Sequence, residues 1–164
     1  MKRAVITLVA LVLALAVGLP ALAQDAARFA GTWKLNADKS DMGGGGRAGG
    51  GQRGGGMGGA MATGMTIKAG ANELTVQRGD QTTVYKLDGS EFTIPGMRGE
   101  AKAKARLDGG KIVVESSQTM EMQGNTMTMS SKETWAVEGG SLVITAVRTT
   151  PRGDRTTKMV YDKQ

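Results

Sequence analysis

Residues Lys111–Val137 read KIVVESSQTMEMQGNTMTMSSKETWAV, and this stretch decides the fold. Side chains of two kinds alternate on both sides of Gly124-Asn125, a dipeptide typical of a two-residue hairpin turn. We therefore predict one long β-hairpin. Its expected register pairs Ile112 with Val137, Val114 with Trp135, Ser116 with Glu133, Gln118 with Ser131, Met120 with Met129 and Met122 with Met127.

All of these pairs fall on one face of the hairpin, because side chains alternate along a strand and a slip of one residue would invert them. The face is apolar at the end far from the turn, polar in the middle and rich in thioethers near the turn. An ordinary core is apolar throughout. We therefore interpret this face as the wall of a cavity.

The rest of residues 24–164 shows the same alternation, interrupted by short turns that contain Gly, Asp, Asn or Pro. One consistent inner face across successive strands predicts an all-β fold, an up-and-down antiparallel meander of about ten strands closed into a barrel. A two-sheet sandwich is the alternative. The other expected strands cover residues 29–35, 65–68, 73–77, 81–87, 91–94, 101–107, 141–149 and 155–161.

The chain begins like a secretion signal. Lys2 and Arg3 precede an apolar run, and Ala21-Leu22-Ala23 supplies small residues for cleavage. We expect residues 1–23 to be removed, which leaves residues 24–164 as one domain without a membrane span. The layout predicts a bacterial protein of the periplasm or the exterior.

A second segment differs in composition from everything around it. Between residues 43 and 59, twelve of seventeen residues are glycine. Such a run cannot pack a core and loses much backbone entropy when it is ordered. We therefore expect a flexible glycine-rich loop over residues 42–61.

Composition excludes several function classes. The chain has no His and no Cys, so the usual zinc ligands and nucleophile–base pairs are missing. Its formal net charge of +6 is spread among acidic residues, which does not indicate a nucleic-acid partner. Glu115 and Glu133 fall on opposite faces of their strands, so they do not form an acid–base pair. We expect no enzyme and no cofactor, and the oligomeric state stays open.

The inner face supplies the candidate site for a small apolar or amphipathic molecule. Polar residues of this face, Arg78, Gln118, Glu133 and Arg148, are expected to orient the ligand's polar end. The other expected lining residues are Tyr85, Phe92, Met120, Met129, Trp135 and Tyr161.

Three alternatives stay open at this stage. Glu133 and Arg148 can simply brace each other with trapped water. The alanines at 101, 103 and 105 either leave room for a ligand or let the opposite wall fill the barrel, so that the protein acts through its glycine-rich loop or outer surface. The last alternative is a Cu(I) site, because thioethers bind this soft ion; its ligands would be Met120, Met122, Met127 and Met129.

The segment Phe29-Ala30-Gly31-Thr32-Trp33-Lys34-Leu35 resembles the opening strand of the fatty-acid-binding proteins, and its Gly-x-Trp core is shared with lipocalins. The resemblance implies a barrel with an internal site, closed at its base by Trp33. That family places a helical lid where this chain has residues 42–61, and its last strand carries Arg-x-Tyr where this chain has Met159-Val160-Tyr161. The sequence is also similar to uncharacterised exported lipocalin-like proteins of bacteria that open with Gly-Thr-Trp-Lys-Leu-Asn.

Overall fold

The computed structural model describes residues 25–41, 64–96, 99–122, 125–150 and 153–164. The expected signal segment, residues 1–23, and the expected glycine-rich loop, residues 42–61, lie outside these ranges. Within the described ranges, no helix combines the length and the apolar character that a membrane crossing requires.

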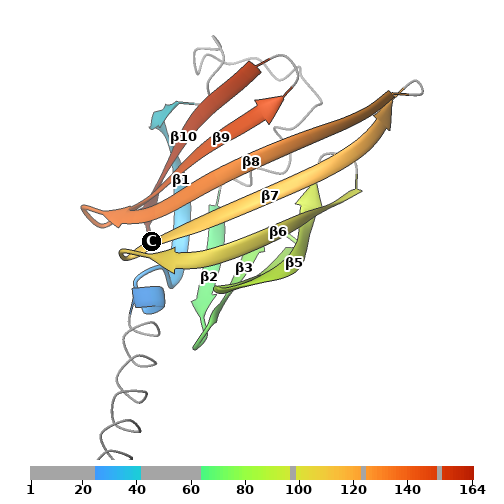
Figure 1. The fold of residues 1–164 in the computed structure, drawn as a ribbon. Coiled ribbons are helices and arrows are strands. Elements are labelled where there is room, and N and C mark those ends of the chain that lie inside the picture. Colours follow the sequence, from blue (N-terminus) through green and yellow to red (C-terminus); the bar gives the residue numbers. More distant parts are fainter. Residues whose placement is uncertain (1–24, 42–63, 97–98, 123–124, 151–152) are drawn as a thin grey trace, which may run out of the picture.

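Ten β-strands make up almost all of the described chain (Figure 1). Long strands alternate inner and outer side chains, as the sequence pattern predicts. The strands are β1 (Gly31–Asp41), β2 (Gly64–Ala69), β3 (Glu73–Arg78), β4 (Gln81–Lys86), β5 (Asp88–Gly96), β6 (Gly99–Asp108), β7 (Lys111–Met122), β8 (Asn125–Glu138), β9 (Ser141–Thr150) and β10 (Gly153–Lys163).

The strands form a single antiparallel sheet in the order β4-β3-β2-β1-β10-β9-β8-β7-β6-β5. Pairing of β1 with β10 joins the two ends of the chain, and the sheet curls so that its edge strands β4 and β5 come close together. The result is a nearly closed up-and-down barrel (Figure 1). The predicted meander is confirmed, and the sandwich is not formed.

One expected connection differs. The sequence predicts a turn at Asp88-Gly89 between paired strands, but β4 and β5 are the two edges of the sheet and share no ladder. The connection is Leu87, whose amide donates to the carbonyl of Asn72 at 2.8 Å. Asp88 belongs to β5, where its Oδ1 accepts the amide of Ser90 at 2.8 Å. Asp88 therefore shapes a bulge inside β5 and does not form a turn between paired strands. The unpaired edges of β4 and β5 form the seam of the barrel.

The β7–β8 hairpin forms, but its predicted register was wrong by two residues. Ile112 pairs with Trp135, Ser116 with Ser131, and Met122 with Asn125. Ile112 and Trp135, both 0% exposed, thus share one layer of the core. A shift of two residues preserves the alternation, so every inner side chain stays on the inner face.

The hydrophobic core occupies one end of the barrel, which we call the closed end. Trp33 is 1% exposed there, and its indole Nε1 donates to the Phe29 carbonyl at 2.9 Å. Phe29 is fully buried, but it lies before the first strand: β1 starts at Gly31 and not at residue 29 as expected. Gly31 has a φ of +143°, and a Cβ built there would lie 2.8 Å from Cε of Lys163. The Lys163 side chain passes Gly31, and its ammonium lies 5.4 Å from the centroid of the Trp33 ring. A glycine two residues before the tryptophan leaves room for this side chain, which explains the Gly-x-Trp spacing.

A bulge interrupts β1 where it runs beside β10. The register jumps between Asn36 and Asp41, and Ser40 fills the gap by accepting the amide of Val160 at 2.9 Å. The Asp162 carboxylate anchors the bulge: it accepts the Asn36 amide at 2.6 Å, the Ser141 hydroxyl at 2.9 Å and the Lys39 ammonium at 3.2 Å. A shallow hollow of about 310 Å³ lies over this bulge on the outside.

Candidate functional site: the inner wall of the barrel

The inner wall consists of layers that run across the strands. The layer at the closed end contains Ile112, Trp135 and Ile144, in neighbouring positions of β7, β8 and β9. All three are at most 1% exposed. Farther along the same strands the inner residues become polar, and beyond that they become methionines. The predicted order of apolar, polar and thioether-rich zones on one face is present.

An aromatic cluster fills the barrel between its two walls. The Tyr85 ring from β4 lies 5.1 Å from the Trp135 ring of β8 and 5.5 Å from the Phe92 ring of β5, measured between centroids. Tyr85 and Trp135 are buried, and Phe92 is half-buried. Rings at these distances and tilted angles attract each other edge to face. The cluster forms a floor, and any ligand in the barrel must lie on the mouth side of it.

Arg78 comes from the mouth end of β3 and folds back onto this floor. Its Nη1 donates to the Tyr85 hydroxyl at 3.3 Å, and its Cζ lies 5.6 Å from the centroid of the Trp135 ring, a cation–π contact. Glu133 takes part through Trp135, whose indole Nε1 donates to Glu133 Oε2 at 2.9 Å. The neighbouring strands β3 and β4 therefore meet the distant strand β8 at one polar contact.

The electrostatics of this contact follow from burial and from the single guanidinium. Burial lowers the pKa of Arg78, but the nearby Tyr85, Glu133 and Tyr161 raise it, and the net pKa lies above its ordinary value. Burial raises the pKa of Tyr85, with Arg78 opposing and Glu133 assisting the shift. The pKa of Tyr161 is raised in the same way: burial raises it, Arg78 opposes the shift and Glu133 assists it. The contact therefore holds a permanent cation beside two neutral phenols.

A polar belt crosses the wall just above the floor. Ser116, Ser131 and Arg148 stand side by side on β7, β8 and β9. All three are half-buried. Ser131 Oγ is enclosed and, within the described residues, has no hydrogen-bond partner. An enclosed hydroxyl without a partner costs about 1–3 kcal/mol, so it is a position where a ligand oxygen or a water would be stabilised.

The β7–β8 hairpin reaches beyond its neighbours toward the mouth (Figure 1). Its ladder with β6 ends at Ser117 and its ladder with β9 ends at Ser130. We call residues 118–122 and 125–129 the overhang. Met120 pairs with Met127 and Gln118 with Met129 on its inner face, and all four are half-buried.

The predicted site residues separate into four places: the floor, the belt above it, the overhang and a position nearer the closed end. The floor unites the largest group, and Met120 and Met129 lie on the overhang. Tyr161 is buried lower down, where its hydroxyl contacts Met159 Sδ at 3.7 Å. The Gln118 side chain leans toward β6: its amide donates to the Glu100 carbonyl at 3.4 Å and lies against Gly96. The group at the floor comprises Arg78, Tyr85, Phe92, Glu133 and Trp135, with Arg148 in the belt above it.

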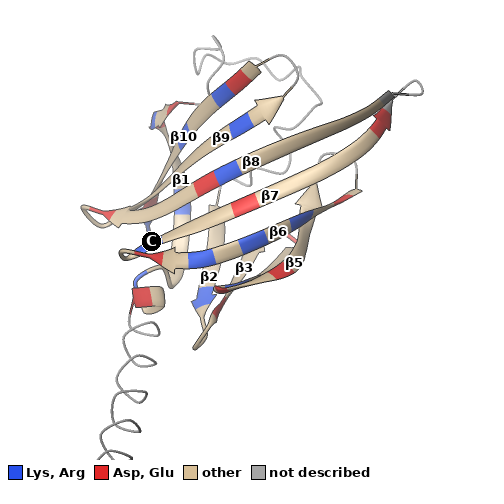
Figure 2. Cartoon of the chain, viewed as in Figure 1, with Lys and Arg blue, Asp and Glu red and all other residues tan. Residues whose placement is uncertain are grey.

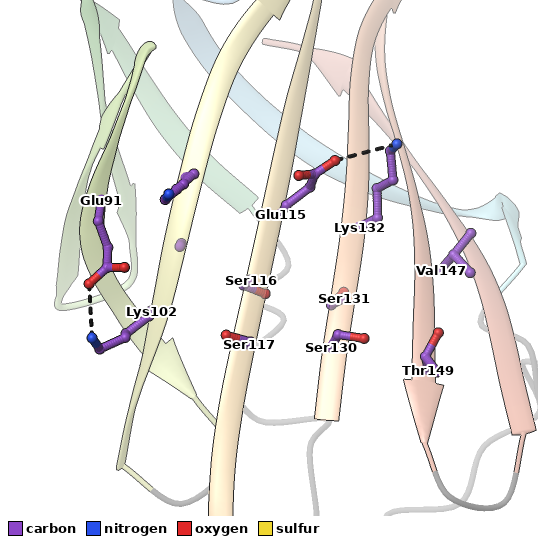
Figure 3. Close-up of a pocket in the computed structure, with 12 residues that line it drawn as sticks. Glu91, Lys102, Glu115, Ser116, Ser117, Ser130, Ser131, Lys132, Val147 and Thr149 are labelled. Carbon is purple, nitrogen blue, oxygen red and sulfur yellow. Dashed lines mark ion pairs between the residues drawn. The ribbon is translucent and has the colours of Figure 1, made fainter. Parts of the chain in front are cut away.

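A hollow of about 610 Å³ that the sequence reasoning missed lies on the outside of β5–β9 (Figure 3). Its floor is made of small residues, and Val147 borders one side. Ser117 and Ser130 lie there, and Ser116 and Ser131 of the inner belt border the same hollow. Ion pairs rim it: Lys102 to Glu91 at 3.0 Å and Lys132 to Glu115 at 3.4 Å. The sequence did contain a sign of this hollow: the outer positions of these strands alternate between acidic and basic residues across the sheet (Figure 2). Such exposed pairs contribute little to stability.

No family model and no curated protein matches this sequence. Solved structures do match, and they share the fold. They include a zebrafish ileal bile acid-binding protein complexed with cholic acid (14% identity, 84% of this chain and 99% of that chain, TM-score 0.53). A REP1-NXSQ fatty acid transporter (18%, 85% and 98%, 0.54) and fatty-acid-binding protein 1 of Echinococcus granulosus (17%, 83% and 97%, 0.50) are further examples. The predicted likeness to the barrel of fatty-acid-binding proteins is confirmed at the level of fold.

Proposed function

We propose that this protein binds a small amphipathic molecule inside its barrel, without catalysing a reaction. The observation that carries the proposal is the polar belt around Ser131, enclosed between an aromatic floor and a methionine-lined mouth. The likeness to barrels that bind bile acids and fatty acids supports it. The polar group of the ligand meets the belt, and its apolar part lies toward Met120 and Met129.

The alternative is an interaction module that acts through its outer surface. The outer hollow across β5–β9 favours this alternative, because it offers a partner a binding surface even when the interior of the barrel is filled. Secretion by a bacterium belongs to both proposals and rests on residues 1–23 of the sequence.

Two adjacent serines distinguish the alternatives. The Ser131 hydroxyl is enclosed, and the neighbouring Ser130 is exposed, although both residues border the outer hollow. We expect S131L to weaken binding of the amphipathic anion 1-anilinonaphthalene-8-sulfonate at least tenfold, and S130L to leave it unchanged. Displacement of this probe by oleate and by cholate tests the ligand class. The reverse pattern, with S130L as the damaging variant, moves the site to the outer hollow and overturns the internal one.

A second measurement does not depend on the folding of S131L, in which overpacking costs about 1–3 kcal/mol. The chain has two tryptophans, so W33F leaves Trp135 as the single indole reporter. A ligand above the floor must change Trp135 emission with the same affinity as the probe signal. A bound probe that leaves this emission unaltered contradicts internal binding.

A further inference from the structure

The methionines of the overhang form a cluster that the ligand site uses only as an apolar edge. We propose that Met120, Met127 and Met129 form a thioether site for a soft monovalent metal ion, Cu(I) or Ag(I). This site goes beyond ligand binding in the barrel and does not depend on it.

The observed register gives one directly opposed methionine pair where the sequence suggested two, and it keeps three methionines adjacent on one face. Met120 lies directly opposite Met127, where Cβ atoms of paired residues are about 4.5–5.5 Å apart. Met129 follows Met127 on the same face of β8, diagonal to Met120 and within reach of a long side chain. Three flexible thioether chains therefore start from adjacent points on one surface. The side chain of Met122 lies outside the description.

The surroundings leave the sulfurs available. Gln118 is the cross-strand partner of Met129, but its side chain leans toward β6, where it donates to Glu100. β6 and β8 flank β7 on opposite sides, so the amide turns away from the sulfurs. The three methionines are half-buried, which gives a metal ion both access and partial shielding from water.

The donor chemistry selects the ion. Thioether sulfur is a soft ligand that favours Cu(I) over hard cations such as Mg²⁺ or Ca²⁺. The chain contains no His or Cys, and the described residues contain no cluster of three His, Cys, Asp or Glu side chains that could hold a metal. Binding of a soft metal ion by this protein would therefore indicate methionine ligands.

The test is an anaerobic Cu(I) titration of the protein against a chromophoric Cu(I) chelator. We expect one equivalent to be bound, and the triple variant M120L/M127L/M129L to lose affinity at least 30-fold. Leucine keeps a similar volume, so the hairpin should stay folded, which circular dichroism checks. The matched control is M159L, a buried methionine of β10 outside the overhang, and its affinity should stay within twofold of wild type.

A second readout avoids any variant. With methionines labelled by ¹³C in the methyl group, Ag(I) should move the resonances of Met120, Met127 and Met129 and leave those of Met65 and Met159 in place. Wild-type protein that takes no Cu(I) from the chelator, or a triple variant that binds as tightly as wild type, overturns the proposal. Silver shifts that spare the overhang methionines do the same.

Discussion

The closed end and the mouth of this barrel are made by the same strands and yet differ in almost every physical respect. At the closed end Trp135 and Ile144 are at most 1% exposed, and the layer around them is apolar. Toward the mouth Ser131 and Met127 are half-buried on the same β8 strand. The closed end of β8 thus stabilises the fold, and its mouth end presents hydroxyl and thioether groups that are only half-buried. A meander permits this separation because each strand crosses the whole barrel.

The strongest test of this division removes the indole at the floor. W135A deletes a fully buried side chain that contacts Tyr85, Arg78 and Glu133, and such truncations cost about 3–5 kcal/mol. M127A removes a half-buried side chain at the mouth, and we expect it to cost less than about 1.5 kcal/mol, since burial there is partial. Urea unfolding monitored by circular dichroism measures both. Equal losses would mean that the mouth is as much a core as the closed end.

A second test addresses the charge that lies between the two regions. The chain has two tyrosines, and the pKa of both Tyr85 and Tyr161 is raised by burial and lowered by Arg78. In R78M we expect both phenols to titrate at still higher pH than in wild type. Tyrosinate absorbance at about 295 nm follows the titration.

The sign of the linked stability change follows from the same shifts. A phenol whose pKa is higher in the folded state keeps its proton while the unfolded chain loses it. The stabilising contribution is therefore complete below the ordinary tyrosine pKa of about 10 and is lost as pH rises through the folded values. Alkaline unfolding curves should show this loss. A phenol of the folded protein that titrates at its ordinary value would contradict the burial of the rings, and an R78M variant that leaves both pKa values unchanged would contradict the proximity of Arg78.

Alternation in the sequence was sufficient to predict the barrel and which face of each strand points inward. Face assignment survived the register error at Ile112–Trp135, because a slip of two residues preserves parity. Seam and register were harder to predict. Asp88-Gly89 has the composition of a turn, but Asp88 shapes a bulge within β5, and only contacts between distant strands decide that β5 stands apart from β4.

The site was predictable by face and not by contact. Placing Arg78, Tyr85 and Trp135 inward required only alternation. Their meeting at one point depends on how β3, β4 and β8 curve around the barrel, which no local pattern encodes. Gln118 shows a contact that alternation does not predict: it sits at an inward position, and its amide donates to the Glu100 carbonyl of β6. Side-chain direction in a half-buried layer depends on available partners as well as on alternation.

The smallest expected effect concerns the bulge of β1, which stabilises the barrel outside both regions. Hydrogen bonds from Asn36, Ser141 and Lys39, in that order, lower the pKa of the Asp162 carboxyl below its ordinary value. The unfolded chain therefore binds a proton more readily, and the contribution of Asp162 is present above the ordinary aspartate pKa of about 3.9 and is lost as pH falls through the folded value.

We expect D162N to flatten the acid limb of the stability curve below about pH 4. D154N is the matched control, because Asp154 is an exposed residue of the same strand, and it should leave the limb unchanged. Unfolding midpoints in urea between about pH 2.5 and 6 measure the difference, a window that spans the ordinary carboxyl pKa values. A D162N curve parallel to wild type throughout would show that the bulge contributes no pH-dependent stability, and that the difference between closed end and mouth is set by the inner wall alone.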